Sequence, residues 1–247
     1  MSVSFELKAW RGTRAENAFV ERLRTWSALD EKARCWAALA HWDTWWFQRA
    51  ALDVYVELLE AEISTSGGEL KISSGLEQKI WSFLQLAKAA LDALAREINL
   101  VYWHLDPHRR LFDPTGRTRW VTFYTVRERL LRIEEFREDP LVRLLEARTH
   151  AETADPIYRD LSHLASASLT APRLIGRVEP QGSRRAGSTC RVREVRIFIP
   201  DDPRQWPFTY ARSFEAGSLF PAILRWLELF TDEVYDKLDL RMRGSMP

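Results

Sequence analysis

Histidine is the side chain best suited to acid–base chemistry near neutral pH, and one of the five histidines lies in a stretch rich in polar groups. That stretch reads "YRDLSHLAS" over residues 158–166. Asp155 and Pro156 precede it and favour a helix start, because Asp is a good N-cap and proline suits the first turn. On that helix Arg159 and His163 lie one turn apart. One interpretation is a catalytic site in which Arg159 binds a phosphate and His163 transfers a proton, although only three residues separate them.

A structural role fits the same stretch of polar residues. A charge inside a helical bundle must be paired, or it costs several kcal/mol. Glu97 lies beside the apolar stripe of its own expected helix and is placed to pair with Arg159. We favour this buried network over the catalytic interpretation, and its expected members beside Arg159 are Arg96, Glu97, Tyr158 and Ser162.

Arginine-rich segments offer a third kind of chemistry. Residues 173–212 hold nine Arg against four acidic residues. Arg side chains interleaved with aromatic ones suit single-stranded nucleic acid, through phosphate contacts and base stacking. Alternation along a strand, with the Arg side chains facing water, explains the same pattern without a ligand. The candidate nucleic-acid-binding residues are Arg184, Arg185, Arg191 and Arg193.

Several other classes of site lack their signatures. The chain has no phosphate-binding Gly-rich loop, no His-Glu-x-x-His and no nucleophile elbow, so we expect no cofactor and no metal. Cys35 and Cys190 have no metal or redox spacing, which favours a reduced, cytoplasmic protein. The net charge is +1, and neither a signal peptide nor a long apolar run is present. We therefore expect no membrane partner.

Helical signals dominate the first two thirds of the chain. Thr13 with Glu16 and Ser74 with Glu77 match the capping box, and prolines mark several boundaries. The expected helices begin near residue 13, run from 30 to 63 and from 74 to 105, and begin again near 125, 139 and 155. Apolar side chains surround much of the 30–63 helix, so we expect it to be buried on more than one side.

After residue 172 the pattern changes to β-branched residues that partly alternate. "RLIGRVEP" and "TCRVREVRIFIP" predict a β-hairpin. Ser218 is the expected N-cap of a last helix that tolerates Pro221 in its first turn. The sequence thus predicts a mainly α protein, a bundle of six to seven helices with a small β-hairpin before the C-terminal helix. We expect a helical domain over residues 1–170, with the hairpin and last helix, 171–247, packed on it.

Two motifs resemble those of HEPN-like bacterial helical families of unknown function. These are "YRDLSHLAS" and the earlier "LAREINLVYWHLDPHRR", and the resemblance covers roughly residues 30–168. Many HEPN proteins are metal-independent ribonucleases, and their signature motif is an Arg followed, after four to six intervening residues, by a His. Two pairs match that spacing, Arg34 with His41 and Arg143 with His150. A chain this rich in Arg is expected to give about two such matches by chance.

Three functions follow as alternatives. The resemblance implies a non-catalytic helical protein that binds a protein partner or itself, in a bacterial defence or toxin–antitoxin setting. It also allows a divergent ribonuclease that uses Arg159 and His163, or Arg34 and His41. The third alternative is non-catalytic binding of single-stranded nucleic acid through the Arg-rich hairpin.

Overall fold

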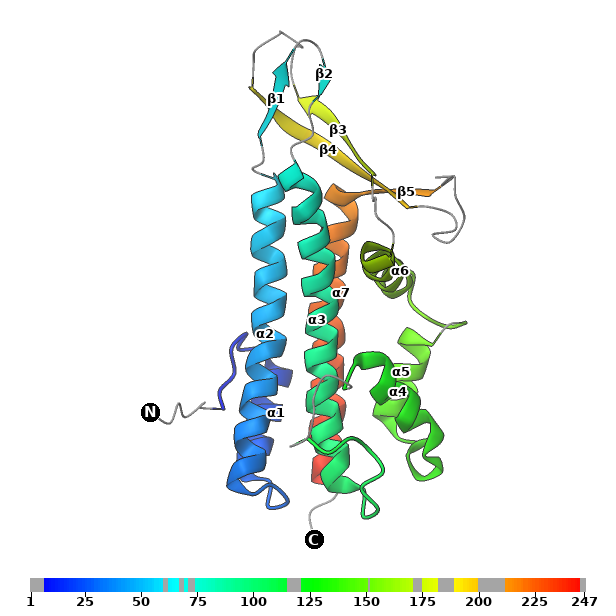
Figure 1. The fold of residues 1–247 in the computed structure, drawn as a ribbon. Coiled ribbons are helices and arrows are strands. Elements are labelled where there is room, and N and C mark those ends of the chain that lie inside the picture. The colour runs from blue at the N-terminus through cyan, green and yellow to red at the C-terminus, as the bar shows by residue number, and fades with distance from the viewer. Residues whose placement is uncertain are drawn as a thin grey trace. The chain divides into compact units, whose positions relative to one another are not determined.

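The protein is mainly helical in a computed structural model that describes residues 7–59, 62–66, 69–70, 74–114, 121–150, 152–170, 175–181, 189–199 and 212–244. A β-hairpin precedes the C-terminal helix, so the predicted fold class is confirmed (Figure 1). The α-helices are α1 (Arg14–Thr25), α2 (Glu31–Leu59), α3 (Ser74–Leu105), α4 (Phe123–Arg132), α5 (Pro140–Thr149), α6 (Pro156–Thr170) and α7 (Ala216–Arg243). Within the described residues, no helix is both long enough and apolar enough to cross a membrane.

The chain forms two compact units, and each is built from separated segments. Unit 1 comprises residues 1–48, 89–155 and 226–247, and unit 2 comprises residues 49–88 and 156–225. Each of the helices α2, α3 and α7 has one part in unit 1 and the other part in unit 2.

In unit 1, side-chain caps set where the shorter helices begin. The Thr13 hydroxyl accepts the backbone N–H of Glu16 at the start of α1, as the sequence predicted. Asp139 accepts the backbone N–H of Leu141 at the start of α5, where Pro140 occupies the first turn. A capping box at α4 pairs Thr122 with Thr125, so this helix begins before the residues that the sequence suggested.

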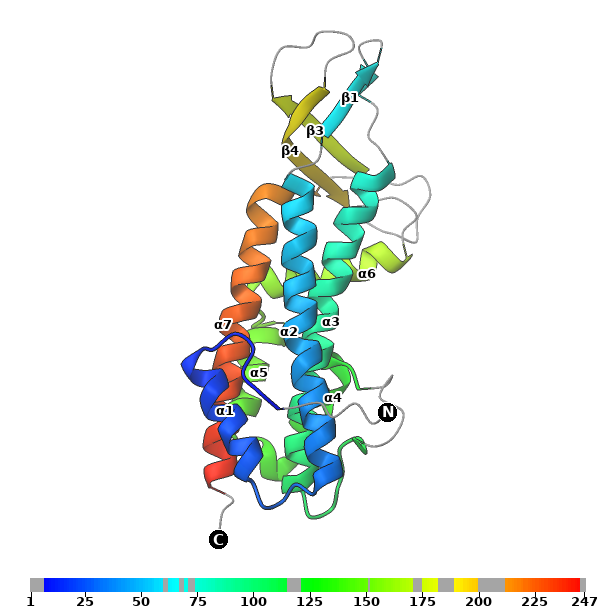
Figure 2. The same cartoon turned by 90° about the vertical axis from the view of Figure 1, so that its left-hand side faces the viewer.

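The core of unit 1 lies where α1 packs beside α2 and α7 (Figure 2). Phe19 of α1 stacks on Tyr235 of α7 at 4.6 Å, and both rings are 1% exposed or less. Ion pairs flank this contact, with Arg11 bound to Asp232 at 2.5 Å. Residues from opposite ends of the sequence thus complete one hydrophobic core.

Unit 2 contains a five-stranded antiparallel sheet. The strands are β1 (Glu62–Ser66), β2 (Glu69–Leu70), β3 (Ile175–Gln181), β4 (Thr189–Ile199) and β5 (Arg212–Glu215). Their order is β2-β1-β4-β3, with β5 also paired to β4. The predicted hairpin is β3 with β4, in a register that sets Val178 opposite Val195 and shifts between Glu179 and Pro180.

Two features of unit 2 differ from the sequence-based expectation. The Gly- and Ser-rich segment after α2 forms β1 and β2, and β1 pairs with β4, with Ile63 opposite Cys190. The last helix begins at Ala216, directly after β5, so Ser218 is not its N-cap. The Ser218 hydroxyl instead donates to the backbone carbonyl of Glu215 at 3.2 Å, a bond within the turn that joins strand to helix.

Candidate functional site

A buried chain of ionisable side chains lies at the centre of unit 1. His41 of α2 sits between two carboxylates, with its Nε2 3.1 Å from Glu16 Oε1 and its Nδ1 2.9 Å from Glu97 Oε2. All three side chains are 1% exposed. Because both ring nitrogens face a carboxylate, both act as donors and the imidazole is protonated.

Each carboxylate of this chain also receives other hydrogen bonds. Glu16 accepts the backbone N–H groups of Trp10, Arg11 and Gly12 at 2.9, 2.8 and 2.7 Å. Gly12 has a φ of 71°, a left-handed conformation that glycine adopts without strain and that turns the segment over Glu16.

Glu97 Oε1 accepts the Thr44 hydroxyl at 2.5 Å and the Tyr235 hydroxyl at 3.0 Å. The network therefore joins α1, α2, α3 and α7.

The charges of this network shift its pKa values strongly. Burial alone lowers the pKa of His41, but the charge of Glu97 and hydrogen bonds to both carboxylates raise it to about 9. Burial likewise opposes ionisation of Glu16, yet the bonds from His41 and from the Trp10 backbone lower its pKa to about 2. Burial and the charge of Glu97 raise the pKa of Tyr235 well above its usual value.

This network is a structural joint rather than a reaction centre. Its ring nitrogens and carboxylate oxygens all have hydrogen-bond partners within the network or in the backbone of residues 10–12, so a substrate would find no free group. Arg34, the partner of His41 in the formal ribonuclease spacing, has an exposed side chain, whereas His41 is 1% exposed. The pair Arg34 and His41 therefore does not form a common site.

Arg159 and Ser162 of α6 lie at the surface rather than in a buried network, contrary to the prediction. Arg159, Ser162 and His163 are exposed, and Tyr158 is half-buried. The buried face of α6 is formed by Leu161, Leu164 and Ala165. Ser162 and His163 directly follow Leu161, which turns both side chains away from that face.

Glu97 does lie in a buried polar network, but its hydrogen-bond partners are His41, Thr44 and Tyr235. Only some members of this cluster had a recognisable feature in the sequence. Glu16 matched a capping box, which gave no reason to expect its carboxylate inside the core, and His41 stood among tryptophans as a core residue.

The remaining predicted residues are dispersed. Arg143 is exposed and forms an ion pair with Glu138, while His150 ends α5 and is half-buried. Arg191 and Arg193 lie on β4, where Arg191 is in register with Gln181 and Glu62. The structure describes the backbone of these two residues but not their side chains. Arg184 and Arg185 fall outside the described residues altogether. Nucleic-acid binding by the hairpin stays a prediction.

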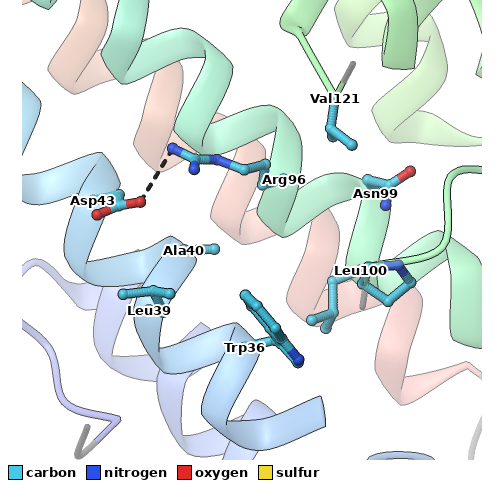
Figure 3. A pocket seen from close by; sticks show the side chains of 9 residues that line it. Trp36, Leu39, Ala40, Asp43, Arg96, Asn99, Leu100 and Val121 are labelled. Carbon is cyan, nitrogen blue, oxygen red and sulfur yellow. Dashed lines mark ion pairs between the residues drawn. The ribbon is translucent and has the colours of Figure 1, made fainter. Parts of the chain in front are cut away.

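A pocket of about 80 Å³ opens beside Arg96 in unit 1 (Figure 3). Arg96 of α3 forms an ion pair with Asp43 of α2, at 3.2 Å between Nη2 and Oδ2. Apolar side chains make most of the remaining wall, and Asn99 is held at its edge by two hydrogen bonds to the backbone of Phe112, at 2.8 and 3.0 Å. We call this the Arg96 pocket. Its lining residues are Trp36, Leu39, Ala40, Asp43, Arg96, Asn99, Leu100, Pro114 and Val121.

Aromatic side chains gather on another face of α2, which we call the aromatic surface. Trp42 and Trp45 are half-buried, and Trp46 is 45% exposed although the sequence suggested burial on several sides. Trp10 packs on Trp42 at 4.5 Å and on Trp45 at 5.2 Å. Phe47 completes the surface, with its ring 5.1 Å from that of Trp46.

These features define a helical bundle protein with a sealed ionic core, a small pocket beside Arg96 and an aromatic surface. A scan against protein-family models, a search of curated proteins and a search of solved structures each found no match.

Proposed function

We propose that this protein acts in the cytoplasm without catalysis, by binding a protein partner through its aromatic surface. A second copy of the chain is the partner that we expect first. The HEPN-like resemblance supports self-association, because the catalytic sites of that group form across dimers. It also supports a role in a bacterial defence or toxin–antitoxin setting.

The observation that carries the proposal is the exposure of Trp46 beside other large rings. Tryptophan is enriched among the residues that dominate protein interfaces, because it buries a large area and loses few rotamers. Trp42, Trp45 and Trp46 follow helical spacing and share one side of α2. Lys8 lies 3.9 Å above the Trp10 ring and adds a charged rim to this apolar centre.

The sealed state of the ionic core supports the non-catalytic part of the proposal. His41, the most strongly perturbed histidine, has both nitrogens bound to carboxylates. A general base must reach the proton that it removes, and His41 is 1% exposed.

Light scattering over a concentration series tests the proposal. We expect a reversible dimer of the wild-type chain at micromolar concentration, and a monomer for Trp46→Glu, because burying the new charge would be costly. The matched control is Tyr124→Glu, which changes a more exposed ring on α4, 61% exposed, and should leave the dimer intact. A chain that stays monomeric, or a dimer that is equally sensitive to both variants, would contradict the proposal.

One observation favours a second function, cleavage of RNA at α6. Arg159 and His163 are both exposed one turn apart, as binding and proton transfer at a phosphate require. The test is cleavage of single-stranded RNA in the presence of EDTA by the wild-type chain. His163→Ala should abolish cleavage, whereas His108→Ala, which changes an exposed histidine of unit 1, should not. Equal cleavage by all three proteins would exclude α6 as the site.

A further inference from the structure

The Arg96 pocket combines an ion pair with apolar walls. Figure 3 shows the guanidinium of Arg96 reaching towards Asp43 at one end, with Trp36 and Leu100 at the other. The side chains of Arg96 and Asp43 are only 27% and 25% exposed. Hydrogen bonds to these groups are therefore stronger than they would be in water.

The ion pair uses only part of the hydrogen-bonding capacity of its members. A guanidinium has five N–H donors. Asp43 is the ion-pair partner of Arg96 among the residues that the structure describes, and the Arg96 Nε is buried there without a hydrogen-bond partner. The Arg96 side chain is 27% exposed, so other N–H groups of the guanidinium remain accessible, and an additional acceptor there would be stabilising.

The charges around the pocket determine which acceptor fits. The charges of Arg96 and Asp43 cancel each other. The neighbouring buried network contains the carboxylates of Glu16 and Glu97 and the imidazolium of His41, which together carry one net negative charge. Burial raises the pKa of Asp43, Arg96 opposes this effect, and the charge of Glu97 adds to it. An incoming anion would be repelled by Asp43 and Glu97. A cation that carries only donors would be attracted by the net negative charge, but it would offer no acceptor to the guanidinium of Arg96.

We propose that the Arg96 pocket binds a small, flat, neutral molecule that carries a hydrogen-bond acceptor next to a donor, of which an aromatic carboxamide is the simplest example. Its carbonyl oxygen accepts from the guanidinium of Arg96, and its N–H donates to the carboxylate of Asp43. The ring lies against Trp36 and Leu100. This inference is independent of the partner-binding function proposed for the aromatic surface.

The size of the pocket limits the ligand. A closed apolar cavity of about 150 Å³ takes up a benzene molecule, whereas the Arg96 pocket holds about 80 Å³. The pocket is partly open, so it encloses the amide and part of the ring while the rest extends to its mouth. With so few enclosed atoms we expect a Kd on the order of 1 mM for a single-ring amide.

Three probes of almost the same shape test the proposal. Benzamide is neutral with a donor and an acceptor, benzoate is an anion with acceptors only, and benzamidine is a cation with donors only. Each is titrated into the full-length chain at pH 7 and followed by ¹⁵N–¹H NMR. We expect benzamide to shift the signals of pocket residues with a Kd of about 1 mM, and the other two to bind at least fivefold more weakly.

Three variants make the test specific. Ala40→Leu fills the pocket and should weaken benzamide binding at least tenfold, whereas Ala18→Leu, which changes a groove between α1 and α7, should not. Asp43→Asn removes one carboxylate and leaves Arg96 uncompensated, so benzoate should then bind more tightly than benzamide. This reversal compares two ligands on one folded protein and does not depend on Ala40→Leu being stable.

Three results would overturn the proposal. The first is the absence of shifts up to 20 mM benzamide, roughly twenty times the expected Kd. The second is binding of benzoate or benzamidine to the wild-type chain as tightly as benzamide. The third is an unchanged order of affinities in Asp43→Asn.

Discussion

The stability of this protein should fall steeply above neutral pH because of one buried residue, His41. Its pKa is about 9 in the folded chain and 6.5 as an ordinary histidine. The folded pKa is the higher one, so the stabilisation is complete below pH 6.5 and is lost as the pH rises through 9. Each unit of pKa difference corresponds to about 1.4 kcal/mol, so roughly 3 kcal/mol of the free energy of unfolding depends on this proton. Because the side chain is 1% exposed, solvent screening does not reduce this value.

Urea denaturation at several pH values between 6 and 9 measures this effect. Between pH 7.5 and 8.5 the folded chain holds nearly one proton more than the unfolded chain. The free energy of unfolding should therefore fall by about 1 kcal/mol per pH unit. His41→Gln keeps a polar side chain that does not titrate, so the difference between wild type and variant should shrink by roughly 3 kcal/mol between pH 6 and pH 9.

A difference that stays constant with pH would refute the electrostatic reasoning, because it would mean that His41 is neutral between the two carboxylates. If His41→Gln does not fold, the imidazole signal of His41 in the wild-type chain provides the same test. Titration of that signal at or below pH 6.5 would contradict a protonated ring.

Three further predictions concern single side chains. Tyr235→Phe removes a hydrogen bond of 3.0 Å to the Glu97 carboxylate and should lower the free energy of unfolding by about 1.5–3 kcal/mol in urea denaturation, since the acceptor is charged. Phe220→Ala removes a fully buried ring that stacks on Phe83 at 3.8 Å, and should cost about 3–5 kcal/mol in the same assay. The pKa of Glu16 is about 2, below its ordinary 4.5, so the stabilisation that its carboxylate provides is complete above pH 4.5 and is lost as the pH falls to 2. In thermal melts, the Glu16→Gln variant should therefore lack the loss of stability that the wild-type chain shows over this range.

Local signals in the sequence predicted much of the helical part of the fold. Thr13 was recognisable as a cap and Asp139 as a helix start, and the short side chains of both accept free backbone N–H groups. The hairpin was recognisable from alternating β-branched residues. By contrast, β1 carries glycines and serines around it and gains its pairing from β4, so nearby residues gave little strand signal.

The site residues were harder to predict because long-range contacts decide their environment. Tyr158, Leu161, Ser162 and Ala165 have the spacing of one helical face, and this suggested that Ser162 is buried. The buried arc is centred on Leu161 and Ala165, and Ser162 falls beyond its edge. Likewise, the residues around Glu97 on α3 could not reveal that helices α2 and α7 would supply its partners.

The interleaving of the two units has a consequence for biosynthesis. Strand β1 is translated early, but β4, the neighbour that it needs, emerges more than a hundred residues later. Both units also wait for α7, whose first part belongs to unit 2 and whose remainder belongs to unit 1. The nascent chain therefore carries unpaired strand edges and uncovered apolar helix faces until the ribosome has nearly reached residue 247, which exposes it to aggregation and favours capture by chaperones.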